Sequence, residues 1–357
     1  MDVRPERPER GRRTGSRLHV LERLRRAPVW LRNRVAPPAI VLCYHRVAKL
    51  ERDPFKLAIE PSLFEAHLHE ITTHGRPAHF NELVRAVRER RRLSRAVIVT
   101  FDDGYADNLH TAKPVLDRLG VPATVFVASG YSDGAREFWW DALERLVLGP
   151  HAIPTTITLP IDGCERGWDV GPAAAAAEDG ADSLDRDAAR YRLMRMIHSA
   201  LAAQPPVAID AALDVLRAAV RQPATPRPTH RACTAGELRD LAAGGTIEIG
   251  SHTRRHPRLT ALPPDEQASE IAGGKADLEE ILGAAVASFA YPFGQRGDLT
   301  SETSRIVREA GFNAACVTEP GVVTARGIDP FRIPRLVVHH RMPAAELGRT
   351  LRYLALG

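Results

Sequence analysis

The sequence contains few cysteines, and none of them lies in a C-x-x-C pair. The four are far apart in the chain, at Cys43, Cys164, Cys233 and Cys316. This spacing favours neither a disulfide framework nor a paired-cysteine metal site. We therefore expect four free thiols in a reducing compartment.

Long apolar runs are also absent. No stretch of about 18 apolar residues occurs, so we expect no helix that spans a membrane. The N-terminus lacks the apolar segment and the small-residue cleavage site of a secretory signal. No apolar segment of the kind that a twin-arginine signal needs follows Arg12 and Arg13. These absences predict a cytoplasmic protein.

Excess positive charge is confined to the first residues. The formal net charge is +5, yet residues 1–34 hold eleven arginines and four acidic residues, so the rest of the chain sums to about −2. A near-neutral body argues against a nucleic acid partner.

The N-terminal arm, residues 1–34, has two parts. Residues 1–16 are rich in Arg, Pro, Glu and Gly, and we expect them to be disordered. After them, Leu18, Leu21 and Leu24 recur at helical spacing between arginines. Two interpretations stay open: a basic amphipathic segment in peripheral contact with the inner face of the membrane, or a solvated helix that docks on the body.

The remainder, residues 35–357, predicts an α/β domain. Apolar residues make up 44% of the 357, enough for a substantial core, and strand-like segments alternate with helical ones as in parallel βα units. A distorted (β/α) barrel of about seven strands fits this alternation, as does a doubly wound sheet. We expect strands within residues 39–47, 96–104, 122–130, 246–253, 286–294, 313–318 and 331–339. We expect helices within residues 62–75, 108–120, 234–245, 265–283 and 301–311, the third of them with a capping box at Thr234 and Glu237.

The alternation of strands and helices is interrupted at residues 150–232, which predict a partly helical insertion. A short strand is expected at 155–159, and amphipathic helices at 188–204 and 208–222. Long insertions are commonly lids over a substrate groove, but structural filler fits the sequence equally well.

Two adjacent carboxylates, Asp102 and Asp103, end the apolar segment "VIVTF". The carboxyl ends of barrel strands are where catalytic groups collect, and a divalent cation would relieve the repulsion between the two acids. Neutral ligands for such a cation occur at His252 and His256, where Pro257 disfavours helical geometry. Two imidazoles and one carboxylate leave coordination positions open, as in catalytic metal sites.

Together, "TFDDG" and the later "SHTRRHPRL" resemble the polysaccharide deacetylase family, carbohydrate esterase family four, in its chitooligosaccharide-deacetylase-like form. The resemblance covers roughly residues 38–148 and 232–340. "YHRV" at Tyr44–Val47, "FWWDALERL" at Phe138–Leu146 and "RIPRL" at Arg332–Leu336 agree with it. "FAYPFGQ" at Phe289–Gln295 places the chain in the FAYP-motif branch.

The resemblance implies a role for each motif residue. Asp103, His252 and His256 would bind a divalent metal, usually Zn²⁺, with Co²⁺ or Ni²⁺ as alternatives. Asp102 would serve as the general base, and the backbone N–H of Phe293 would donate to the oxyanion. Tyr291 and Pro292 of the same motif would lie against the substrate.

Two roles differ from the family's usual pattern. Many relatives have a base-orienting arginine where this chain has Ala290, and we expect Arg332 or Arg335 to replace it. For the general acid, His45 is the first candidate, and His339 and His340 are the others.

Trp139 and Trp140 have two interpretations. An aromatic face suits the apolar side of a sugar ring, but such a pair also commonly anchors an insertion to the body of a protein.

The resemblance therefore implies metal-dependent hydrolysis of N-acetyl groups from an amino-sugar-containing glycan. O-deacetylation is an alternative, as is a glycan-binding module that has lost turnover. A non-haem iron oxygenase would use the same ligand types, but strand–helix alternation favours the barrel. The sequence specifies neither the glycan nor the oligomeric state.

Overall fold

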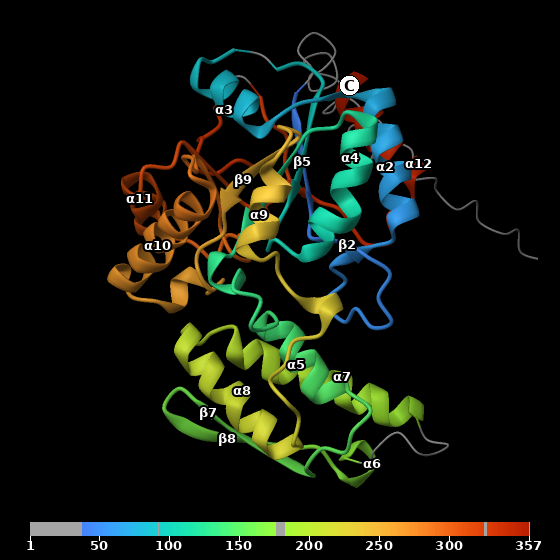
Figure 1. The fold of residues 1–357 in the computed structure, drawn as a ribbon, viewed down its shortest axis with the longest axis vertical. Helices are drawn as coiled ribbons and strands as arrows, with labels where there is room; N and C mark the ends of the chain where they lie inside the picture. Colours follow the sequence, from blue (N-terminus) through green and yellow to red (C-terminus); the bar gives the residue numbers. More distant parts are fainter. Residues whose placement is uncertain (1–37, 92, 176–182, 325–326, 357) are drawn as a thin grey trace, which may run out of the picture.

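A computed structural model of the chain describes residues 38–91, 93–175, 183–324 and 327–356. The predicted arm at 1–34 lies outside the described residues. Figure 1 shows an upper lobe built around the sheet and a lower, mostly helical lobe. Among the described helices, none has the length and apolar character needed to cross a membrane.

A parallel sheet forms the centre of the upper lobe. Its strands run in the order β11-β10-β9-β6-β5-β1-β12, and the short β4 pairs with β5. In chain order they are β1 (Ile40–Tyr44), β4 (Arg76–Pro77), β5 (Ala96–Phe101), β6 (Ala123–Val127), β9 (Ile247–Ser251), β10 (Ser288–Ala290), β11 (Ala314–Cys316) and β12 (Leu336–Val337). The predicted distorted barrel is therefore confirmed.

The segment that leads into β12 joins the two edges of this curled sheet. Ile333 bridges to Cys316 of β11, whereas Leu336 pairs with Leu42 of β1. The final strand segment thus contacts the first strand and the last central strand. This position brings the C-terminal part of the chain beside the end of β5.

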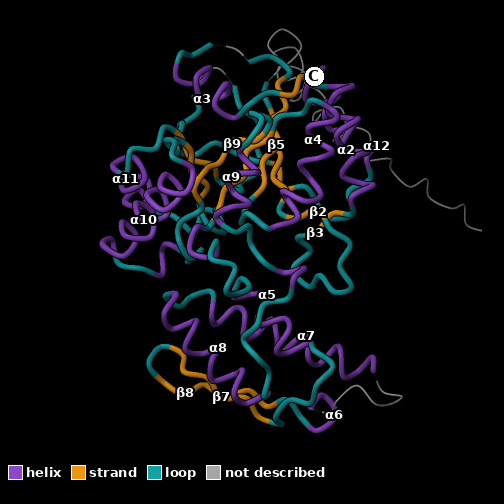
Figure 2. Tube along the Cα trace, in the orientation of Figure 1, coloured by secondary structure: helices purple, strands orange, loops and turns teal. Residues whose placement is uncertain are grey.

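Helices surround the sheet, as the tube view shows (Figure 2). They are α2 (Pro61–His74), α3 (Phe80–Arg88), α4 (Lys113–Leu119), α9 (Ala235–Ala242), α10 (Pro264–Leu282), α11 (Ser301–Glu309) and α12 (Ala344–Leu356). The capping box predicted at Thr234 and Glu237 is present at the start of α9. Two of these helices, α3 and α12, were not among those predicted.

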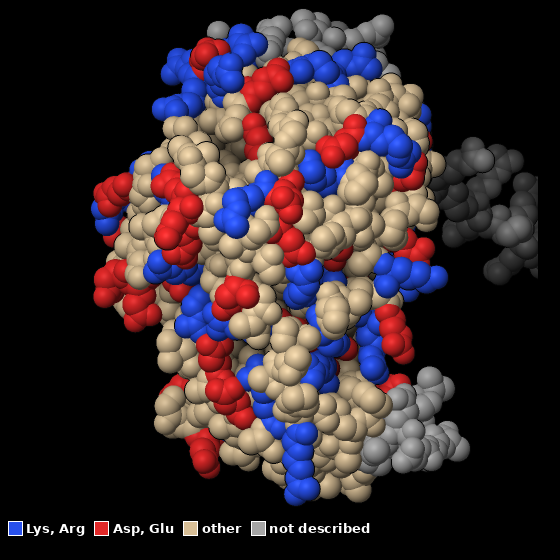
Figure 3. Space-filling view, in the orientation of Figure 1, with Lys and Arg blue, Asp and Glu red and all other residues tan. Residues whose placement is uncertain are grey.

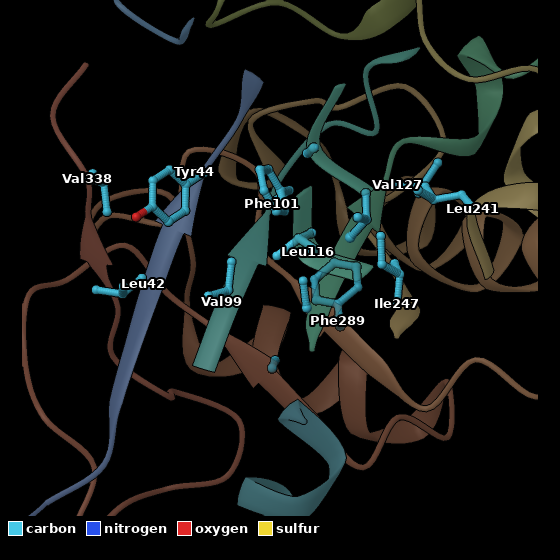
Figure 4. Packing of buried hydrophobic residues seen from close by; sticks show 14 of the residues in the cluster. Leu42, Tyr44, Val99, Phe101, Leu116, Val127, Leu241, Ile247, Phe289 and Val338 are labelled. Carbon is cyan, nitrogen blue, oxygen red and sulfur yellow. The ribbon is translucent and has the colours of Figure 1, made fainter. Parts of the chain in front are cut away.

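Alternate residues of each strand pack on opposite faces of the sheet. Leu42, Val99 and Phe101 belong to the cluster between the sheet and its helices, part of which Figure 4 shows. Val41 and Ile98 belong to a separate buried cluster on the other face. Because both faces of the sheet are buried, successive residues along each strand are apolar.

The lower lobe has a hydrophobic core of its own. It contains α5 (Trp139–Leu148), β7 (Thr156–Ile161), β8 (Cys164–Asp169), α6 (Pro172–Ala175), α7 (Ser183–Leu201) and α8 (Pro206–Val220). The two helices predicted within 150–232 are present, and β7 pairs with β8 in an antiparallel hairpin. The lobe begins with α5, before residue 150, because α5 packs against α7 and α8. A short parallel pair, β2 (Arg46–Val47) and β3 (Ala58–Ile59), lies in the segment after β1.

Charge is evenly mixed on the surface drawn in Figure 3, where basic and acidic side chains lie beside one another. All four cysteines are free, as expected, and three of them are buried.

Candidate metal centre and active site

The end of β5 directs two carboxylates into the same pocket. Along this strand, Ile98 belongs to the buried cluster that also contains Val41. Asp102 lies four residues later and therefore points to the same face of the sheet. Asp103 has a φ of 73°, in the left-handed region, and Gly104 follows with a φ of 85°. This turn allows Asp103 to line the same pocket as Asp102, and both are 2% exposed.

Arg335 binds both oxygens of Asp102, at 2.6 and 2.7 Å. Its guanidinium is fully buried and also donates to the carbonyl of Val317 at 3.2 Å. Burial disfavours the charged form of Asp102, but Arg335 and His252 outweigh it, so the pKa of Asp102 lies below its usual range. Asp102 is therefore an ionised carboxylate with a fixed orientation.

The other predicted arginine, Arg332, lies elsewhere. It is partly exposed and forms an ion pair with Glu319 at 2.8 Å. Of the two predicted arginines, Arg335 is therefore the one that contacts Asp102.

Asp103, His252 and His256 form a compact buried cluster. One potential ligand atom from each lies within 4.8 Å of the other two. Oδ1 of Asp103 is 3.8 Å from Nε2 of His252 and 3.6 Å from Nε2 of His256. The structure therefore brings together the three residues predicted as metal ligands.

Each imidazole is held in a different way. Nδ1 of His252 is 2.7 Å from the carbonyl oxygen of Ala290, which leaves its Nε2 facing Asp103. His256 has a φ of 55°, and its backbone N–H donates to the hydroxyl of Thr253. Its buried Nδ1 has no hydrogen-bond partner among the described residues, and its ring packs against Trp140, 4.7 Å away between centroids.

The protonation states of this cluster fit a divalent cation. Burial lowers the pKa of His252 to about 4, and burial together with His252 lowers that of His256. Burial and the neighbouring Asp102 raise the pKa of Asp103. Two neutral imidazoles and a carboxylate that lacks a cationic partner are a suitable ligand set for Zn²⁺, and a cation would remove the cost of ionising Asp103.

A second group, Cys43, His45 and Asp102, is equally compact but suits a metal less well. Both oxygens of Asp102 are already bound to Arg335. Burial raises the pKa of the Cys43 thiol, which disfavours the thiolate that a metal needs.

The cluster lies in a pocket with an empty volume of about 620 Å³, part of it open to solvent. The pocket is lined by His45, Phe55, Leu57, Asp102, Asp103, Trp140, His198, His252, His256, Phe293 and Thr318. Of the three predicted acid candidates only His45 lines it, with a ring nitrogen within 4.8 Å of an Asp102 oxygen. His339 and His340 pack against each other and do not line this pocket.

Phe293, the predicted oxyanion donor, adopts a strained turn. Its φ is 59°, and its carbonyl accepts a hydrogen bond from the Thr318 hydroxyl at 2.6 Å. Its N–H has no hydrogen-bond acceptor among the described residues. The ring of Phe293 lies in the pocket wall, 5.2 Å from that of His256.

Tyr291 and Pro292 do not line the pocket, contrary to the prediction of substrate contacts. The Tyr291 hydroxyl donates to the carbonyl of Phe331 at 3.1 Å, and its ring is buried in the cluster between sheet and helices. The reason is that the alternation of β10 continues into Tyr291, which lies on the same face as Phe289, whereas Ala290 lies on the opposite face. Pro292 is buried, and its carbonyl accepts from Gly294.

The two tryptophans occupy different positions. Trp140 lines the pocket, and its indole N–H donates to Tyr105 at 2.8 Å, whose hydroxyl in turn donates to Asp141 at 2.7 Å. Trp139 is not among the lining residues and stacks on His198.

Sequence reasoning missed four residues of the pocket: Phe55, Leu57, His198 and Thr318. They come from the β3 region, the lower lobe and the segment after β11, and no short motif marks them. Only the folded chain places them beside the carboxylates.

Comparison with known structures identifies the fold. The curled parallel sheet with its helices is the α/β fold of NodB-like deacetylases. The chain covers 99% of a Streptococcus pyogenes deacetylase, PplD in complex with acetate, at a TM-score of 0.56 over 88% of this chain and 17% identity. IcaB from Ammonifex degensii aligns with a TM-score of 0.54 at 20% identity, covering 89% of this chain and 98% of that one.

The chain belongs to the polysaccharide deacetylase family. The family model "Polysaccharide deacetylase" matches residues 89–155 and 205–315. A curated protein of Bacillus subtilis (strain 168), "Putative polysaccharide deacetylase YxkH", is 28% identical over 323 residues, which are 89% of this chain and 78% of that protein. Membership supports a hydrolase that removes acetyl groups from glycans.

Proposed function

We propose that this protein is a divalent-metal-dependent deacetylase that removes N-acetyl groups from an amino-sugar-containing glycan. The observation that carries the proposal is the buried Asp103–His252–His256 cluster beside an ionised Asp102 held by Arg335. Zn²⁺ is the ion we expect, and Co²⁺ or Ni²⁺ could substitute.

The ligands and the base have separate tasks in this proposal. When bound by Asp103, His252 and His256, a divalent ion would polarise the acetyl carbonyl and lower the pKa of water. Asp102 is not one of the metal ligands. Arg335 fixes the orientation of its carboxylate, which can therefore accept a proton. This carboxylate accepts a proton from the water that attacks the carbonyl carbon.

Two further groups would complete the reaction. The Phe293 N–H would donate to the developing oxyanion. His45, close to Asp102, would deliver a proton to the leaving nitrogen as the C–N bond breaks. The products are acetate and a free amine on the sugar.

The most direct test of this activity is acetate release. Purified protein supplied with Zn²⁺ or Co²⁺ is incubated with acetylated amino sugars and oligosaccharides, and acetate and product mass are measured. We expect release that a chelator abolishes and that Asp102→Asn reduces by at least about 100-fold. Glycan binding without acetate release would favour the binding-module alternative, and oxygen consumption would favour an oxygenase.

We also propose a cytoplasmic location with peripheral membrane contact through residues 1–34. The support is the concentration of arginine in that arm. Co-sedimentation with anionic liposomes tests it: removal of residues 1–34 should abolish binding, and unchanged binding would contradict it.

A further inference from the structure

The lower lobe contributes one polar side chain to the pocket, the imidazole of His198 on α7. Beside it in the pocket wall is the ring of Phe55, whereas the rings of Trp140 and Phe293 lie against His256. The family model matches residues up to 155 and again from 205, so His198 lies in a segment that this model leaves unmatched. It therefore lies in the insertion and outside the part of the chain that the family model matches.

Two aromatic rings hold His198 in place. Its ring centroid lies 4.8 Å from that of Trp139 with an interplanar angle of 22°, and 4.8 Å from that of Phe55 with an angle of 39°. Both contacts restrict the rotation of the imidazole. The geometry is that of a side chain fixed before any ligand arrives.

No hydrogen bond or ion pair of the described residues uses the ring nitrogens of His198. Burial, with Arg258 and Arg195, lowers the pKa of His198 to about 4, so the ring is neutral near pH 7. A neutral imidazole offers one donor and one acceptor. It can therefore pair with a hydroxyl group, which is also both a donor and an acceptor.

His198 is distinct from the groups that perform the chemistry. A ring nitrogen of His45 lies in a compact group with an oxygen of Asp102, whereas His198 is on α7, stacks on Trp139 and belongs to neither compact group. His198 thus belongs to the part of the pocket wall that the lower lobe forms, which we call the outer pocket.

We propose that His198 is a specificity-determining residue that binds a hydroxyl of an uncharged sugar unit adjacent to the one that carries the acetyl group. The ring of Phe55, which lines the pocket beside His198, packs against the apolar face of that sugar. The insertion then selects an oligosaccharide over a single acetylated sugar. This inference rests on the proposed deacetylase function.

The test compares His198→Phe with wild type on two substrates. Phe retains the stacking on Trp139 and Phe55 but loses both ring nitrogens. For an N-acetylglucosamine oligomer we expect KM to rise about threefold to tenfold with little change in kcat, the effect of one lost hydrogen bond. For a small acetyl ester, which does not reach the outer pocket, the rate should be unchanged.

Met196→Phe is the matched control, because Met196 is on the same helix and 49% exposed. It should behave as wild type with both substrates. A wild-type KM in His198→Phe, or an equal loss on the ester, would contradict the inference.

Calorimetric binding of the same oligomer to protein without added metal gives a readout that needs no turnover. We expect weaker binding to His198→Phe than to wild type, and equal binding would refute the role of His198. Absence of acetate release by wild type counts against the proposed function, whereas the binding comparison still tests His198.

Discussion

Arg335 and Asp102 form a buried ion pair whose partners are far apart in the sequence. The ion pair with the guanidinium offsets the free-energy cost of removing the carboxylate from water. Removal of the arginine therefore leaves an unpaired buried charge. We expect Arg335→Met to lower the free energy of unfolding by about 3–5 kcal/mol. Chemical denaturation measures this change.

Arg332→Ala provides the comparison, because Arg332 pairs with Glu319 at the surface. The loss there should be no more than about 1 kcal/mol. Equal effects of the two substitutions would show that Arg335 is not the buried partner described above.

The same pair sets the pH dependence of the base. Without Arg335, only the neighbouring imidazoles oppose the effect of burial on Asp102, so its pKa rises and the carboxylate ionises at higher pH. The acidic limb of the pH profile of kcat/KM should therefore move to higher pH in Arg335→Met, and less in Arg335→Lys. An unmoved limb in both variants would mean that Asp102 is not the base.

Asp141 is a second buried acid, with a pKa raised to about 7 by burial. Its folded-state pKa exceeds its unfolded value, so its stabilising contribution is complete below about pH 4 and is lost as the pH rises through about 7. Asp141→Asn keeps an acceptor for Tyr105 but cannot ionise. Its melting temperature relative to wild type should therefore rise between about pH 5 and about pH 8.

Asp265→Asn, at an exposed position in the first turn of α10, controls for loss of one acid. The difference in melting temperature between Asp265→Asn and wild type should not rise between about pH 5 and about pH 8. If Asp141→Asn follows the pH dependence of wild type, Asp141 does not titrate as described.

At the scale of single elements, α12 closes the core over α2. Leu347 on α12 is fully buried in the cluster that includes Leu68 and Ile71 of α2. We expect Leu347→Ala to cost about 2–5 kcal/mol of unfolding free energy, because it removes buried methyl groups and leaves a cavity. Tyr353→Ala on the same helix, 58% exposed, should cost less than about 1 kcal/mol.

Equal losses at the two positions, measured by urea denaturation, would contradict this packing. We did not predict α12 from sequence, because its apolar residues are buried only when the helix packs against α2. The capping box of α9 was predicted, because both of its partners lie within one helical turn.

Across the whole molecule, the features predicted from sequence are those that depend on residues close together in the chain. Apolar runs predicted the strands, and the carboxylates and histidines at strand ends predicted the cluster around Asp103. The partner of Asp102 stayed ambiguous between Arg332 and Arg335, because β12 brings it from a distant part of the chain. Tyr291 was misplaced because its motif does not reveal which face of β10 it occupies. His198 was missed because only the packing of the two lobes brings it to the pocket.

The measurement that tests the account most directly is calorimetric titration of metal-stripped protein with Zn²⁺. Wild type should bind one ion per chain, and Asp103→Asn and His256→Gln should each weaken that binding by roughly 100-fold or more. His110→Gln, a surface histidine paired with Glu237, should bind as wild type does. Wild-type affinity in Asp103→Asn would contradict the assignment of this cluster as the metal centre.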